Sequence, residues 1–204
     1  MPVSEKLEVL KSRIPKSIQT PNLLFNLQNG SQFTGYQKSN KSSYHVHVEL
    51  KNVDLSQSFL CGYLKIKGLT DDWPDLCTFF EGEIIGEKHS FLTRKWEADE
   101  SIDRQHWSQF PSFKPMEPFF NQDGFKHDFD SDDYIYMRWK EHFLVPDHRI
   151  KSISGASFAG FYYICFRKST GVLSGIYFHH HSEWFQQLHL EHVNDRSYST
   201  FEFR

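Results

Sequence analysis

The sequence predicts an all-β protein of one domain, with short antiparallel strands arranged as a barrel or a sandwich. Short apolar runs recur along the chain and are separated by Gly, Pro, Asn and Asp, which form turns. Aromatic residues make up 17% of the chain and include 20 Phe, a composition that favours strands. Many short strands are typical of barrels and sandwiches, and 204 residues suit one domain.

The N-terminal part of the chain differs from the rest. Residues 1–30 are expected to form a peripheral arm, and residues 31–204 the barrel domain. Within the arm, Ser4 is placed to cap a short helix that ends at Pro15.

The first clear strand, 44–50, has a period of two. Its apolar residues, such as Val46 and Val48, fall on one face, while His45 and His47 fall on the other. One face is therefore expected in the core and the other in solvent. The same reasoning predicts strands at 59–67, 78–85, 134–139, 158–166, 175–179 and 188–192.

Two short helices are expected to interrupt the strands. One follows Asp99 and carries Trp107 on its apolar side, and the other follows Ser182 and includes Leu188. Between them, the loop 111–133 is rich in Pro, Phe and Asp and has no periodicity. Its length suits a lid or flap.

Charge and cysteine content restrict the partners and the compartment. With 23 Lys and Arg against 26 Asp and Glu, the chain has no basic field to attract nucleic acid or anionic lipid. The three cysteines, Cys61, Cys77 and Cys165, lie in apolar stretches and suit free thiols in a reducing compartment. No run of 18 apolar residues occurs. We expect a protein of the cytoplasm or the nucleus, with no nucleic acid partner and no membrane insertion.

Two patterns resemble metal sites but lack the required ligands. Residues 128–132 copy the opening of a calcium loop, but Asp133 stands where Gly is needed and Trp139 where the bidentate Glu belongs. The three histidines at 179–181 would point alternately to opposite faces of a strand and could not converge. We therefore expect no metal and no cofactor.

The segment 155–160 is a near miss to the nucleophile elbow of hydrolases. A triad of Ser157, His148 and Asp147 would need a strand-to-helix turn, but the segment leads into an aromatic strand. Small residues there make room for the close approach of a peptide backbone. A hydrolase remains a distant alternative.

Glu141 is the residue with the clearest chemical implication. Alternation along 136–141 places Met137, Trp139 and Glu141 on the same face. If that face is the core, the carboxylate is costly to bury without a cation. Glu141 is then either paired internally with Arg or Lys, or it waits for a cationic ligand.

Long stretches of the chain resemble the vacuolar import and degradation family, the substrate receptors of the glucose-induced-degradation (CTLH) ubiquitin ligase. The matching segments are 60–70, 78–85, 91–100, 136–141, 143–148 and 154–166. The resemblance implies an eight-stranded, antiparallel, calycin-like barrel with a few inserted helices, whose open end binds a peptide that begins with proline. The receptor itself would not be an enzyme.

The resemblance also implies functional residues. Glu141 and Tyr162 would receive the terminal ammonium of the peptide, and Gln37 and Ser157 its backbone groups. The walls of the proline pocket would be Val46, Leu64, Ile66, Leu69, Leu76 and Phe158.

Two further expectations follow from the resemblance. The C-terminal residues Phe201, Phe203 and Arg204 would dock onto an armadillo-type scaffold subunit of the ligase, and the substrates would be metabolic enzymes, notably of gluconeogenesis. The alternative is a lipocalin-like carrier, since barrels of this size often hold one small apolar ligand.

Overall fold

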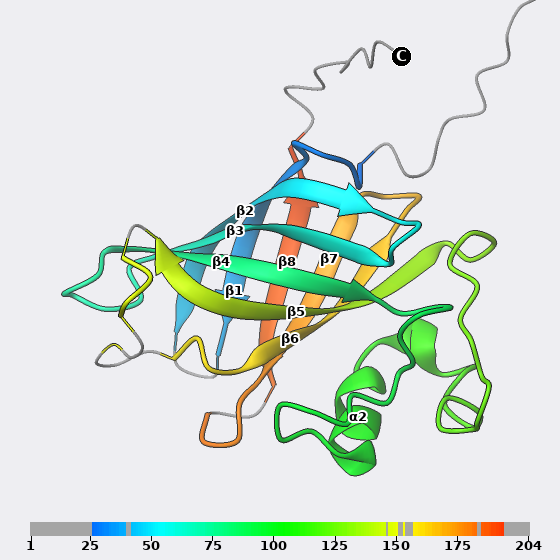
Figure 1. Cartoon of the computed structure of the whole chain (residues 1–204). Helices are drawn as coiled ribbons and strands as arrows, with labels where there is room; N and C mark the ends of the chain where they lie inside the picture. The colour runs from blue at the N-terminus through cyan, green and yellow to red at the C-terminus, as the bar shows by residue number, and fades with distance from the viewer. Residues whose placement is uncertain are drawn as a thin grey trace, which may run out of the picture.

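The computed structural model describes residues 26–39, 42–145, 147–150, 153, 157–182 and 185–193. These residues form a closed barrel in which each strand pairs antiparallel with the next and β1 pairs with β8 (Figure 1). The predicted fold is confirmed. The strands are β1 Gln32–Lys38, β2 Ser43–Asp54, β3 Phe59–Lys67, β4 Asp75–Ile84, β5 Tyr134–Val145, β6 Phe161–Arg167, β7 Val172–Phe178 and β8 Gln186–His192.

The inside of the barrel is the main hydrophobic core, and the alternation in β2 and β5 is confirmed. Val46 and Val48 of β2 are fully buried there, together with Met137 and Trp139 of β5. His45 and His47, on the other face of β2, are only partly buried.

A β-bulge near the end of β5 changes the alternation. Phe80 pairs with Glu141 but Phe79 pairs with Phe143, so His142 is the extra residue. The bulge lets both Glu141 and Leu144 be buried although three positions separate them.

The helix after Asp99 is confirmed and lies outside the barrel. Helix α2, Glu100–Trp107, begins after Asp99, whose side chain accepts a 2.9 Å hydrogen bond from the Ile102 amide. Trp107 packs edge-on against Tyr163 of β6 and belongs to a cluster on the outer face of β5 and β6.

The loop 111–133, expected as a lid or flap, packs on the outer wall of the barrel and does not cover the end of the barrel at which Glu141 lies. It begins with a short 3-10 helix, η1, at Pro111–Phe113, and the side chains of Phe113 and Phe120 are buried in the outer cluster. These aromatic anchors make it a cover for the barrel wall.

Three other details of the sequence-based prediction are wrong. Leu188 was expected both in a helix after Ser182 and in a strand at 188–192. It lies in β8, so the strand is confirmed and the helical assignment of Leu188 is wrong; Leu188 and Leu190 alternate with polar residues and face the core. The strand expected from residue 158 begins only at Phe161. Strand β1 was not recognised, because Phe33 is its one buried large apolar residue and the other aromatic residue, Tyr36, is exposed.

The barrel packing begins slightly before residue 31. The Leu27 side chain is buried in the main core, and the Gly30 amide donates to the Leu50 carbonyl at 2.8 Å. The expected helix from Ser4 and the expected docking residues Phe201, Phe203 and Arg204 lie outside the described residues. Within the described part of the chain, no helix is long and apolar enough to cross a membrane.

Candidate functional site

A cavity of about 480 Å³ opens at the end of the barrel where β1 ends and β2 begins. Antiparallel pairing brings the ends of β1, β3, β5 and β7 to this rim, together with the starts of the other strands. The lining residues are Gln37, Ser39, Tyr44, Ile66, Leu69, Leu76, Glu141, Ser157, Tyr162, Tyr177, His179, His181, Ser182 and Gln186.

Glu141 is a buried acid in this cavity, and among the described residues Thr78 is its one hydrogen-bond donor. Its side chain is only 4% exposed, and the Thr78 hydroxyl donates to its Oε1 at 2.6 Å. Among the described residues, no Arg, Lys or His forms an ion pair with it. Burial raises the pKa of Glu141 to about 7, although the Thr78 hydrogen bond and the charge of Lys140 lower it in part.

The cations next to Glu141 in sequence are occupied elsewhere. Arg138 points to the outer face of β5, where its Nη2 lies 3.0 Å from Glu83 Oε2. The Lys140 ammonium donates to backbone carbonyls, including that of Ala159 at 2.8 Å. Of the two alternatives for Glu141, the described residues therefore favour an acid without an internal cation.

Tyr162 lies on the next strand and presents an acceptor to the cavity. Its hydroxyl donates to Gln37 Oε1 at 2.8 Å, and Gln37 Nε2 donates in turn to Gln186 Oε1 at 3.1 Å. Because the phenol proton is committed to Gln37, the lone pairs of the phenol oxygen remain available. Burial, and then the nearby charge of Glu141, raise the pKa of Tyr162 well above its ordinary value, so the phenol stays neutral.

Ser157 lies at the exposed lip of the cavity and is held by Tyr177. The Tyr177 hydroxyl donates to the Ser157 carbonyl and accepts from the Gly160 amide, both at 3.0 Å. The Ser157 hydroxyl accepts from the Ala159 amide at 3.2 Å.

The geometry gives no support to a hydrolytic triad. The two carboxylate oxygens of Asp147 each accept a 3.0 Å bond from the Arg149 guanidinium. The Ser157 hydroxyl is bonded within its own turn. The serine and the acid are thus each engaged with other residues of their own loops.

The expected wall residues are only partly brought together at the cavity. Ile66, Leu69 and Leu76 line it. Val46 and Leu64 belong to the main core and Phe158 to a cluster with Leu76 and Leu144, and none of these three is among the lining residues.

The lining or supporting residues that sequence reasoning missed include Tyr44, Thr78, Tyr177 and Gln186. Thr78 had a signal, since it lies between Leu76 and Phe80 on the inner face of β4. Gln186 had none, because the segment around it was expected to be helical.

The histidines at 179–181 are at the cavity mouth. His179 and His181 both line it, with ring centroids 5.8 Å apart. Within the described residues, no group of three His, Cys, Asp or Glu is arranged to hold a metal ion.

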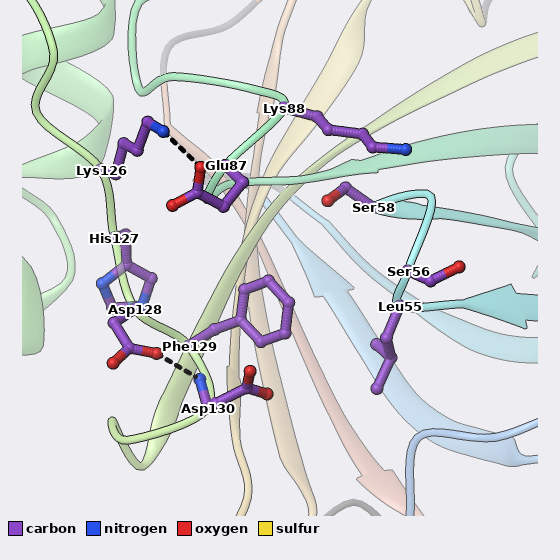
Figure 2. Close-up of a pocket in the computed structure, with 10 residues that line it drawn as sticks. All are labelled: Leu55, Ser56, Ser58, Glu87, Lys88, Lys126, His127, Asp128, Phe129 and Asp130. Atoms are coloured by element: carbon purple, nitrogen blue, oxygen red, sulfur yellow. Dashed lines mark hydrogen bonds and ion pairs between the residues drawn. The ribbon is translucent and has the colours of Figure 1, made fainter.

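A second cavity, of about 500 Å³, lies beyond the opposite ends of β2 and β4. Figure 2 shows Lys126 reaching Glu87 across this lining. Lys88 donates to the Gln57 side chain at 2.6 Å. These charges already have partners, so the cavity that holds Glu141 is the better candidate site.

The fold and this site define a single antiparallel barrel with a cavity at one end, and a buried carboxylate and a phenol line that cavity. The comparison with known families agrees with the resemblance in the sequence. The chain belongs to the vacuolar import and degradation protein family, whose model matches residues 26–193.

Individual relatives cover most of the chain. It is 58% identical over 179 residues to the glucose-induced degradation protein 4 homolog of Mus musculus. The matched region covers 87% of this chain and 82% of the relative. The GID complex substrate-recognition subunit 4 of Schizosaccharomyces pombe is 35% identical over 195 residues, 87% of this chain and 97% of the relative. The subunit 4 of Saccharomyces cerevisiae is 33% identical over 217 residues, 78% of this chain and 60% of the relative.

Proposed function

We propose that this chain is the substrate-recognition subunit of a multi-subunit ubiquitin ligase, and that it binds proteins by a free N-terminal proline. Relatives named as GID complex substrate-recognition subunits support the receptor role. The observation that carries the ligand chemistry is Glu141, a buried carboxylate in an open cavity with a hydroxyl as its described partner.

An N-terminal proline fits the polar part of the cavity. Its secondary ammonium has a full charge and two N–H donors, and Glu141 and Tyr162 offer the matching acceptors as charge-assisted hydrogen bonds. An internal or acetylated proline lacks this ammonium and is not expected to bind. Charge recognition thus decides whether a chain terminus is accepted.

The apolar part of the cavity suits the pyrrolidine ring. Ile66, Leu69 and Leu76 line this side, and burying a ring of this size contributes about 1.5–3 kcal/mol. The fixed φ of proline also lowers the ordering cost of binding. Ring shape therefore decides which cationic terminus is preferred.

The following residues of the peptide would leave the cavity along its lip. Gln37, Gln186 and Ser157 lie there and offer amide and hydroxyl groups to a peptide backbone.

In this role the chain carries no catalytic step itself. It would present metabolic enzymes, notably of gluconeogenesis, for ubiquitin-dependent degradation in the cytoplasm or nucleus. Docking to an armadillo-type scaffold through Phe201, Phe203 and Arg204 completes the proposal.

Calorimetric titration tests the proposed ligand. A short peptide beginning Pro-Gly should bind in the micromolar range, and its N-acetylated twin should not. Glu141→Gln keeps the shape of the side chain and an acceptor for Thr78 but removes the charge, so it should weaken binding by at least about 30-fold.

If the acetylated twin binds as well as the free peptide, the ammonium is not recognised and the proposal is wrong. The cavity would then be that of a carrier for small, neutral ligands.

A further inference from the structure

Lys140 is a cation on the outer face of β5 that bonds a turn at the rim of the candidate site. Its Nζ lies 2.8 Å from the carbonyl oxygen of Ala159, 2.9 Å from that of Glu141, 3.0 Å from that of Gly160 and 3.4 Å from that of Phe158. Within the described residues, it forms no ion pair with a carboxylate.

These carbonyls lie beyond the last β5–β6 residue pair, where backbone amides of the neighbouring strand no longer donate hydrogen bonds. The β5–β6 ladder ends at the pair Lys140 and Phe161, so Glu141 and residues 158–160 lie beyond it. Buried carbonyls need a donor, and an ammonium has three N–H groups that can converge on several oxygens. Lys140 thus takes over the role that a neighbouring strand would have.

The same turn is fixed from the cavity side by Tyr177, which bonds the Ser157 carbonyl and the Gly160 amide. Gly160 permits this close packing, because a Cβ there would lie 2.1 Å from the Phe178 carbonyl oxygen. Residues 157–160, here called the lip turn, are therefore held between Lys140 outside and Tyr177 inside.

We infer that Lys140 is a positioning residue: by holding the lip turn, it fixes Ser157 at the cavity mouth and so sets the affinity of the site for its ligand without touching that ligand. This inference rests on the proposed function for the nature of the ligand. A side chain on the outer wall would then control binding inside the barrel.

The test compares Lys140→Met with Lys168→Met. Lys168 is the matched control, since it also donates to backbone carbonyls, those of Phe129 at 2.9 Å and Asp130 at 3.1 Å, but lies beside the second cavity. Lys140→Met keeps the apolar stem and removes the ammonium.

For the folded proteins, Lys140→Met should bind the Pro-Gly peptide about tenfold more weakly, as expected for losing charged hydrogen bonds, and Lys168→Met should bind it unchanged. Lys140→Arg should recover part of the affinity, because it restores the charge with a less suitable geometry. Hydrogen exchange of the Gly160 amide should be faster in Lys140→Met alone.

Equal affinity of the folded wild type and Lys140→Met would overturn the inference, as would an equal loss in Lys168→Met. If the wild type itself binds no Pro-Gly peptide, the proposed ligand is wrong and Gly160 exchange decides about Lys140. Unchanged exchange in Lys140→Met would then overturn its positioning role, while faster exchange would support it.

Discussion

Single residues at the cavity differ in how far the sequence reveals them. The inward direction of Glu141 follows from its alternation with Met137 and Trp139, and the structure confirms it. The partners of Glu141 do not follow from this pattern, because Thr78 reaches it from another strand. A period of two gives the face of a side chain but not its neighbour across the sheet.

The raised pKa of Glu141 makes the affinity for a cationic terminus dependent on pH. Binding an ammonium requires the ionised acid, whose pKa is about 7. As pH falls from 7 to 5.5, affinity should drop by about 15-fold in all, with a slope that approaches about tenfold per unit at the lower end, because the acid must lose its proton in order to bind. The α-ammonium of a peptide stays charged in this window. Calorimetry at several pH values measures the slope.

Glu141→Gln should abolish that slope. His179 and His181 also line the mouth of the cavity, so the variant with both replaced by Gln serves as the control. A slope that survives in Glu141→Gln but disappears in the histidine variant would assign the effect to the mouth and not to the acid.

At the scale of elements, regular periodicity was predictable and its interruptions were not. The inner face of β2 and the start of α2 at Asp99 are confirmed. The bulge at His142 could not be predicted, because a bulge depends on the paired strand. The start of β8 near Gln186 was misread as a helix because Leu188 and its neighbours also fit a helical spacing over so short a run.

The N-cap of α2 offers a test of an element remote from the cavity. Asp99→Ala removes the acceptor for the Ile102 amide and should lower the free energy of unfolding by about 1 kcal/mol. Asp99→Asn should retain most of the stability, because the Asn side-chain oxygen can also accept from the Ile102 amide. Urea denaturation measures both.

Affinity for the Pro-Gly peptide should stay unchanged in Asp99→Ala. Helix α2 packs on the outer wall, and none of its residues lines the cavity. A weaker affinity in the folded variant would show that the outer layer and the site are coupled.

At the scale of the whole molecule, closure of the barrel assembles the site. Gln37 and Tyr162 are 125 positions apart in sequence yet share a hydrogen bond, and Gln37 and Gln186 are 149 positions apart. Strand patterns predict an all-β class but leave barrel and sandwich open. The family resemblance, and not periodicity, indicated a closed barrel and a shared rim.

The buried acid should also cost the whole protein stability. Folding raises the pKa of Glu141 from 4.5 to about 7, so its stabilising contribution is complete below pH 4.5 and is lost as pH rises to 7. At 1.36 kcal/mol per unit, the loss reaches about 3 kcal/mol. Glu141→Gln does not titrate and should be the more stable protein at pH 8.

Urea denaturation of wild type and Glu141→Gln at pH 4.5 and 8 measures this difference. The advantage of the variant should grow by up to about 3 kcal/mol between the two values. Other titrating groups are common to both proteins and cancel in the comparison. An advantage that is the same at both pH values would mean that the folded protein does not bury an ionised Glu141. A difference in the free energy of unfolding that grows with pH would mean that burial of the ionised Glu141 destabilises the folded protein.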